Sequence, residues 1–405
     1  MTSACRSPGL LRCLLKFNVL LMVALLFLRA IQTFHITRQE LQERQEQLTS
    51  TITQSFSKLH THTKPKRWDS SKSAVLGLAT NYSLGVYKIF VGSLRATGYN
   101  GHIILGIAKD APPDVMQYLT TNKVTTHVVE VAEKCTYEGE KSAHDGNGDN
   151  TVVHWKCAKD YPDYKLTWAR VALYRDWLLA CPDCTDGVML TDVRDSFFQR
   201  DPFSTVKPEQ QRPLMVFEEH PDLDTTHWLT DFPIKTCKGV PIGARPMLCS
   251  GSTMGSREGI LDYTKVMMEE FDDWKTKANC RTNMKGDDQS IHNYLYYANR
   301  FKDVISIPHR TGPINVAGFQ ASILFEQAKK EKIGGGNGSK FIKQGDDENW
   351  QNWFPEEYGL IDPKTGLLTN LDGNPSGQVH QFDRFGFIIQ SWLNKNNNKN
   401  WPYNS

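Results

Sequence analysis

The sequence predicts an α/β protein whose mostly parallel sheet is flanked by helices. Short apolar runs alternate with segments of helical spacing between residues 74 and 180, as they do in a doubly wound parallel sheet. The apolar run at 188–190 stops at Asp192 and Asp195, and buried central strands are continuous apolar runs of this kind. Ligands of open α/β sheets bind outside the carboxyl ends of the strands, so these two acids are the first candidates for a site.

Length and composition set broad limits on the protein class. The chain has 405 residues, of which 39% are hydrophobic and 11% aromatic, enough to build a sizeable core. Its net charge is only +2, whereas a protein that tracks a phosphate backbone needs a basic excess. We therefore expect no nucleic-acid partner.

The N-terminus has the pattern of a membrane signal. Arg12 and Lys16 precede an apolar run at 17–28, which Arg29 follows. This run is shorter than the roughly 20 residues of a full span, but residues 10–15 extend it if Lys16 snorkels. No small-x-small cleavage site follows, which favours an uncleaved anchor over a cleaved signal peptide of the same length. Basic residues before the run place the N-terminus in the cytosol and the bulk of the chain in the lumen.

The rest of the chain divides by composition and periodicity. The expected parts are a cytosolic tail at 1–9, a transmembrane signal anchor at 10–31, a stem at 32–73, a luminal domain at 74–393 and a flexible tail at 394–405. Strands are expected at 74–79, 102–107, 125–131, 188–190 and 214–217, helices at 87–97, 115–119, 164–180, 260–271 and 290–297, and loops at 138–150 and 334–338.

Nine cysteines bear on the compartment, and seven of them follow the N-terminal apolar run. In a secretory lumen most of these pair, which leaves one odd thiol. Cys181 and Cys184 have zinc-like spacing, but no second pair with metal-ligand spacing accompanies them. A disulfide is therefore favoured over zinc, either between these two cysteines or with more distant ones.

Four motifs follow one another along the chain. They are Thr191-Asp192-Val193-Arg194-Asp195 with Phe197-Phe198-Gln199 and Asp201-Pro202-Phe203, then Cys249-Ser250-Gly251-Ser252-Thr253-Met254-Gly255-Ser256-Arg257, Asp287-Asp288-Gln289-Ser290-Ile291-His292-Asn293 and Val379-His380-Gln381-Phe382-Asp383-Arg384. In this order they resemble the motifs of Golgi-type GT-A glycosyltransferases, which use nucleotide-sugar donors. The resemblance covers about residues 74–392 and is close to a branch in plants, algae and protists that reads Thr-Asp-Val-Arg-Asp. It implies a single-pass type II Golgi membrane protein with a GT-A, Rossmann-like domain in the lumen.

A divalent metal is the cofactor that the resemblance implies. Carboxylates are hard oxygen ligands that suit Mn²⁺ or Mg²⁺, although Asp192 at a strand end also suits a helix cap. By resemblance, Asp192, Asp195 and His380 bind the metal. The motif is Asp-x-x-Asp, with Arg194 where Asp-x-Asp has its second acid, so the identity of the direct ligand stays open. Arg194 either faces the donor phosphates or pairs with a structural acid.

Other segments are expected to contact the donor, a UDP- or GDP-sugar. Thr80 and Asn81 follow the first strand, where a GT-A fold places a nucleotide-contacting loop. Gly251 and Ser252 are expected in a tight turn that lets backbone amides approach a ligand, although a plain turn needs the same residues. Arg170 either reaches the donor diphosphate or is a surface charge.

The third motif supplies candidates for the acceptor side. Asp288 matches the position that in many GT-A enzymes contacts the acceptor or acts as base, and an inverting transfer needs such a base. Asp287 and Gln289 beside it are expected to bind the acceptor. The two acids also suit the first turn of a helix. Whether the transfer inverts or retains the configuration of the sugar stays open.

Two glycosylation sequons begin at Asn81 and Asn337. A glycan on Asn81 would obstruct the donor, so that residue is either unmodified or away from the site. Asn337 is the better acceptor of a glycan.

The expected function is transfer of a sugar from a nucleotide-diphosphate sugar to a hydroxyl of a glycan or glycoprotein. A membrane-anchored sugar-binding protein, either a lectin or an inactive transferase, is one alternative. A metal-dependent phosphotransferase or hydrolase is the other, and the sequence shows no nucleophile motif or dense His/Asp cluster for it.

Overall fold

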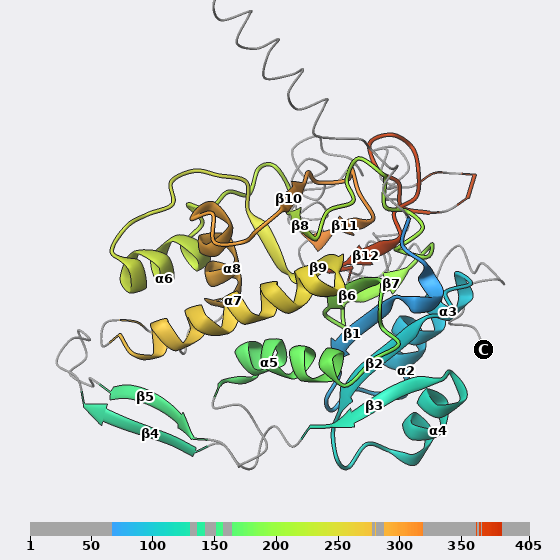
Figure 1. Ribbon diagram of the computed structural model, residues 1–405, viewed down its shortest axis with the longest axis horizontal. Coiled ribbons are helices and arrows are strands. Elements are labelled where there is room, and N and C mark those ends of the chain that lie inside the picture. The colour runs from blue at the N-terminus through green and yellow to red at the C-terminus, as the bar shows by residue number, and fades with distance from the viewer. Residues whose placement is uncertain are drawn as a thin grey trace, which may run out of the picture. The chain divides into compact units, whose positions relative to one another are not determined.

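A computed structural model describes the part of the chain that holds the expected α/β domain (Figure 1). The described residues are 67–129, 136–141, 151–156, 164–277, 280, 287–318, 362, 364–365 and 367–382. The chain divides into Met1–Pro65 and Lys66–Ser405, and every element described below belongs to the second unit. Among the described residues, none of the helices combines the length and apolar character of a membrane span. The expected tail at 1–9, anchor at 10–31, sequon at Asn337 and tail at 394–405 lie outside them.

The central sheet has seven strands in the order β10-β8-β9-β6-β1-β2-β3. All neighbours are parallel except β9, which runs antiparallel to both β6 and β8. The prediction of an α/β protein with a mostly parallel sheet is therefore confirmed. The strands are β1 (Ala74–Leu78), β2 (His102–Ile107), β3 (Val124–Val128), β6 (Gly187–Thr191), β8 (Leu214–Glu218), β9 (Leu248–Ser256) and β10 (Val304–Ile307).

Helices cover both faces of this sheet, which explains why its central strands are continuously apolar. Side chains alternate between the faces, so Leu76 and Leu190 lie in one hydrophobic cluster while Val75 and Met189 lie in the other. The first face packs against α5 (Leu166–Leu179), α7 (Arg257–Lys275) and α8 (Asp287–Tyr297). The second packs against α2 (Leu84–Tyr87), the π-helical turn η2 (Lys88–Gly92), α3 (Ser93–Ala96) and α4 (Pro113–Thr121).

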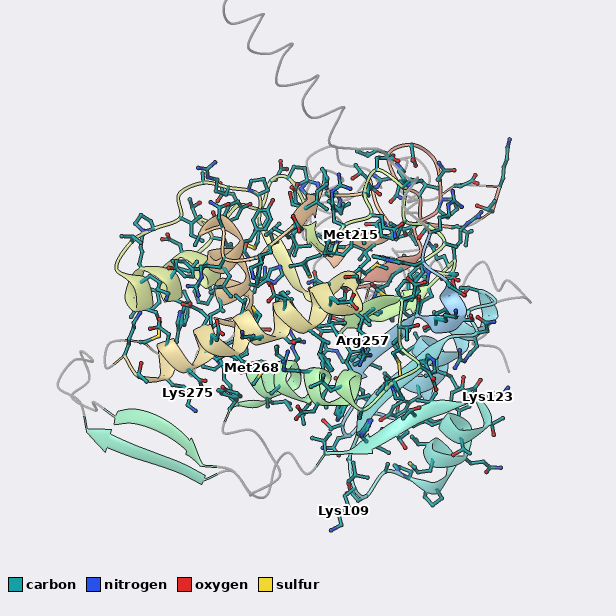
Figure 2. All side chains as sticks on the ribbon, in the orientation of Figure 1. Lys109, Lys123, Met215, Arg257, Met268 and Lys275 are labelled. Atoms are coloured by element: carbon teal, nitrogen blue, oxygen red, sulfur yellow. A yellow bond between two sulfur atoms is a disulfide. The ribbon has the colours of Figure 1, made fainter. Side chains whose placement is uncertain are left out.

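Side chains fill the space between the sheet and these helices (Figure 2). Met215 of β8, labelled there, is completely buried. Trp168 of α5 and Phe271 of α7 stack with their ring centroids 4.7 Å apart. The expected helices at 164–180, 260–271 and 290–297 correspond to α5, α7 and α8.

A second sheet of three strands lies beside the main one and was not predicted. It has the order β11-β12-β7, formed by β11 (Ile314–Val316), β12 (Gln378–His380) and β7 (Ser196–Phe198). β7 follows the acidic residues directly, and its antiparallel pairing with β12 places His380 opposite Ser196. This short pairing brings the C-terminal motif to the acidic one.

The loop prediction for residues 138–150 was wrong at its N-terminal end. β4 (Thr136–Lys141) and β5 (Thr151–Lys156) form an antiparallel pair in which Thr136 lies opposite Lys156. The Gly and Asp content of the segment suggested a loop, but a backbone paired with an apolar, β-branched partner forms a strand regardless of its own weak propensity.

The folded unit begins earlier than the expected residue 74. Residues Ser70–Lys72 form the 3₁₀ turn η1, and the Asp69 backbone N–H donates to Asp186 Oδ2 at 2.7 Å. The Trp68 ring packs edge-on against Phe203. Residues 67–73, expected in the stem, therefore belong to the packed domain.

Disulfides confirm the local pairing considered for the cysteines. Cys181 bonds Cys184 just after α5, and Cys237 near the end of α6 (Trp228–Lys238) bonds Cys280. Cys249 of β9 is a free, buried thiol.

Candidate functional site

The acidic residues lie at the carboxyl end of β6, as expected. The Asp192 backbone N–H donates to Gly251 O on β9 at 2.8 Å. Val193, the next residue, packs so closely over β1 that a Cβ on Gly77 would lie 2.3 Å from Val193 Cγ2. The two carboxylates differ in exposure, because the Asp192 side chain is 30% exposed and that of Asp195 only 3%. The loop therefore holds one acid at the surface and one inside.

His380 completes a cluster with these two acids. Its Nε2 lies 3.5 Å from Asp195 Oδ1 and 3.9 Å from Asp192 Oδ2, and one ligand atom from each of the three residues lies within 4.8 Å of the others. The imidazole is completely buried, and no described residue forms a hydrogen bond of normal geometry with its Nε2. Burial opposes the charged ring, but Cys249, Asp195 and Asp192 outweigh it and raise the pKa of His380 well above its ordinary value.

The residues of this cluster fit a divalent cation. Two carboxylates and an imidazole form a donor set that Mn²⁺ accepts, and the carboxylates suit Mg²⁺. A small residue also keeps the space open, because a Cβ on Gly251 would lie 2.4 Å from His380 Cε1 and 2.7 Å from Asp192 Oδ2. Gly251 thus lines the cluster, although residues 250–252 belong to β9 and not to the tight turn that the sequence suggested.

A buried polar network holds the acidic loop in place. Gln378 of β12 donates through Nε2 to Thr191 Oγ1 at 2.6 Å and to Ser196 Oγ at 2.8 Å. The Ser252 hydroxyl donates to Gln378 Oε1 at 3.3 Å and lies 3.2 Å from Thr191 Oγ1. These four residues, the Gln378 network, are all buried and tie β6, β7, β9 and β12 together on either side of the loop. Ser252, expected to contact the donor, is instead part of this network.

Arg170 of α5 bridges two acids of the site. Its guanidinium pairs with Asp192 Oδ1 through Nη1 and with Asp288 Oδ2 through Nη2, the latter at 2.7 Å. Burial opposes its charge, but Asp192 and Asp288 outweigh that effect and raise the pKa of Arg170 above its ordinary value. Arg170 is therefore not a solvated surface charge. It connects the acidic motif to α8.

The three residues at the start of α8 have different surroundings. Asp288 lines a pocket with Arg170 and Asp192, and accepts a hydrogen bond from Ser250 Oγ at 3.3 Å. The Gln289 side chain donates to Glu219 Oε1 at 3.0 Å. Asp287 lies outside that pocket.

Asp287 is a core residue of the α5–α8 contact. Its side chain is completely buried, pairs with Lys165 and accepts a hydrogen bond from Trp168 Nε1 at 3.0 Å. Burial raises the pKa of Asp287 to about 7, although Lys165 and Trp168 favour the ionised form. The structure thus places Asp287, expected to bind the acceptor, in the packing between two helices.

An open pocket with a volume of about 220 Å³ adjoins the acidic loop. Of the expected donor contacts, Thr80, Arg170 and Arg194 line it, as do the acids themselves. The Arg194 side chain is 54% exposed and its Nη2 lies 3.9 Å from Asp195 Oδ2. Asn81 is exposed in the left-handed backbone region (φ 61°) and is not among the lining residues.

Sequence reasoning missed several residues around the site. Tyr82 and Tyr174 line the open pocket, and Tyr263 lines the smaller one near Asp288. Cys249 lies against His380, with its Sγ 3.4 Å from Nδ1. The sequence offered two signals for it, its place at the start of the second motif and the odd number of cysteines that follow the N-terminal apolar run. Gln378 had no signal, because an amide in a short C-terminal strand is an ordinary residue.

No protein-family model and no curated protein sequence matches this chain.

Proposed function

We propose that this protein is a metal-dependent glycosyltransferase of the GT-A type, which transfers a sugar from a nucleotide-diphosphate sugar to a hydroxyl of a glycan or glycoprotein. The observation that carries the proposal is the cluster of Asp192, Asp195 and His380 at the carboxyl edge of the sheet, beside an open pocket. The mostly parallel sheet flanked by helices is the architecture that the sequence resemblance implies. The two distant motifs that supply the cluster come from that same resemblance.

The cluster suits a nucleotide-diphosphate donor because transfer releases a charged diphosphate. A divalent cation held by Asp192, Asp195 and His380 would neutralise that leaving group. Arg194 is exposed at the rim of the same pocket, where its guanidinium suits a bidentate contact to phosphate oxygens. Arg170, tied to two carboxylates, keeps Asp192 and Asp288 at a set separation.

Asp288 is the residue best placed to act on an acceptor hydroxyl. Its carboxylate lines the pocket that Arg170 and Asp192 share, and hydrogen bonds from Arg170 and Ser250 orient it. A base so oriented accepts the hydroxyl proton in an inverting transfer. In a retaining transfer the same carboxylate orients the acceptor. Gln289 and Glu219, hydrogen-bonded to each other beside it, offer further polar contacts for a sugar.

The cellular setting is part of the proposal. The apolar run and its basic flank suggest a single-pass type II membrane protein anchored through residues 10–31, with the domain in the lumen. The Golgi as its compartment follows from the resemblance of the four motifs. The two disulfides accord with an oxidising compartment. Asn337 is the proposed site of glycosylation on this chain.

Ligand-dependent thermal stability of the full-length protein tests the proposal. We expect one nucleoside diphosphate, UDP or GDP, to raise the melting temperature with Mn²⁺ present and not with EDTA, because ligands that bind the folded state stabilise it. Asp192→Asn and His380→Gln should abolish this shift. Asp222→Asn is the matched control, since the Asp222 side chain is 70% exposed and pairs only loosely with His220.

Thermal stability and an assay of phosphate release together separate the other functions. No shift with any nucleotide would refute the donor site. Stabilisation by free glycan without nucleotide would then indicate a lectin or an inactive transferase. Phosphate release from a nucleotide, without sugar transfer, would indicate a phosphotransferase or hydrolase.

A further inference from the structure

The His380 ring lies between a thiol and the two acids. On one side its Nδ1 is 3.4 Å from the Cys249 sulfur. On the other side its Nε2 is 3.5 Å from Asp195 Oδ1. Both Cys249 and His380 are buried, so water does not compete for either ring nitrogen. The neighbours of the ring therefore decide which nitrogen keeps its hydrogen when the ring is neutral, as a ligand must be.

That choice determines whether His380 can hold a cation. A neutral imidazole ligates through the nitrogen that has a lone pair, and the other nitrogen carries the hydrogen. Nε2 is the nitrogen that faces Asp192 and Asp195, so it would be the ligating one. Nδ1 must then carry the hydrogen and donate it. Ligating histidines almost always have such a hydrogen-bond acceptor behind them.

The structure places a sulfur where this acceptor is needed. Gln381, the residue after His380, donates through Nε2 to the Cys249 sulfur at 3.7 Å, so the sulfur already accepts one hydrogen bond. The backbone beside Cys249 is held as well, since the Leu248 N–H donates to Asn293 Oδ1 at 2.9 Å and Leu248 O accepts from Asn293 Nδ2 at 2.8 Å. Cys249 therefore has little freedom to move away from Nδ1.

We propose that Cys249 is a positioning residue: its sulfur accepts a hydrogen bond from the Nδ1–H of His380 and so directs the Nε2 lone pair toward Asp192 and Asp195. This inference rests on the cation site proposed above and adds a residue to it. It also explains a free thiol in a chain whose other described cysteines form disulfides.

Mn²⁺ affinity of the full-length protein, measured by isothermal titration calorimetry, tests the proposal. Cys249→Ala removes the acceptor, and we expect Mn²⁺ to bind about 10–100-fold more weakly, as when other partners of metal-bound histidines are lost. Cys249→Ser keeps an acceptor and should stay within a few-fold of the wild type. Met254→Ala is the control, because Met254 is a completely buried residue of the same strand and hydrophobic cluster. It should lower the melting temperature and leave Mn²⁺ affinity unchanged.

The outcomes separate this proposal from the one on which it rests. If the wild type binds Mn²⁺ and Cys249→Ala binds it equally well, the role of Cys249 is refuted and the cation site stands. If the wild type binds no Mn²⁺, both are refuted.

A measurement on the wild type covers the case in which Cys249→Ala does not fold. Histidine-selective ¹⁵N labelling and long-range ¹H–¹⁵N correlation report the tautomer of each ring in the Mg²⁺-loaded protein. The His380 signal is the one missing in His380→Gln. We expect it to be protonated at Nδ1. Protonation at Nε2 would overturn the proposal.

Discussion

The Nε2 atom of His380 lies 3.5 Å from Oδ1 of Asp195, although the two residues are 185 positions apart in the sequence. One short strand pair produces this contact, because β12 places His380 opposite Ser196, the residue that follows Asp195. The candidate site therefore depends on a small sheet and on the polar network that joins it to the large one.

Removal of the central amide of that network should loosen the site. Gln378→Leu leaves the Thr191 and Ser196 hydroxyls buried without their donor, and we expect a loss of about 1–3 kcal/mol in the free energy of unfolding. Mn²⁺ affinity should fall at least tenfold, because the loop carrying both acids is no longer held at each end. Calorimetry and urea unfolding measure the two effects.

Gln199→Leu is the control for that variant. Gln199 exchanges hydrogen bonds with the Leu368 backbone and donates to Ser376, but it makes no hydrogen bond with the Thr191 and Ser196 hydroxyls that Gln378 satisfies. The Gln199→Leu variant should be less stable than the wild type and bind Mn²⁺ with unchanged affinity. Equal affinity in both variants would contradict the role given to Gln378.

Arg170 should stabilise the fold through the carboxylates that it bridges. In Arg170→Met the Asp288 carboxylate stays largely buried without its cation, which costs about 3–5 kcal/mol of unfolding free energy. Adding Asp288→Asn should recover part of this loss. Arg175→Lys, on the same helix, replaces a guanidinium that donates to Leu261 O and should have a much smaller effect. A urea titration that finds Arg170→Met as stable as the wild type would refute the bridge.

His292 should make the protein less stable in mild acid. It is completely buried against the Tyr263 hydroxyl at 3.0 Å, and burial, with a smaller contribution from Arg170, lowers the pKa of His292 to about 3. At pH values between its ordinary pKa of 6.5 and its folded-state pKa of about 3, His292 is protonated in the unfolded chain and neutral in the folded protein. Stability therefore falls as the pH falls through this window, by about 1.4 kcal/mol per unit.

The comparison that tests this dependence uses unfolding free energies at pH 7 and pH 5. His292→Asn should show a shallower pH dependence than the wild type. Tyr263→Phe keeps the buried histidine and should retain the steeper one. Identical slopes in the wild type and His292→Asn would rule out His292 as the source.

The Cys237–Cys280 disulfide should contribute more stability than the Cys181–Cys184 disulfide. The first joins residues 43 apart and the second residues 3 apart. In the chain-entropy model, a disulfide lowers the conformational entropy of the unfolded chain and so raises its free energy. The increase is about 4 kcal/mol for the longer loop and less than about 2 kcal/mol for the shorter one. Unfolding of the two double serine variants in guanidinium measures the difference. A larger loss for the Cys181/Cys184 pair would contradict the model.

Strands and helices with strong local patterns could be predicted from the sequence. The apolar runs that became β1, β2, β6 and β8 needed no tertiary information, because strands buried on both faces are apolar throughout. β9 was missed because its Gly- and Ser-rich stretch at 250–252 has the composition of a turn. It forms a strand since both β6 and β8 supply hydrogen-bond partners for its backbone.

The sequence by itself determined the fold class, the position of the acidic pair at a strand end and the identity of His380 as a candidate ligand. Only the tertiary structure decided that Arg170 bridges Asp192 and Asp288, that Asp287 and Ser252 belong to the interior, and that Cys249 lies behind His380. Local periodicity records which face of an element is buried. The partners of a buried polar group come from distant segments, and only packing selects them.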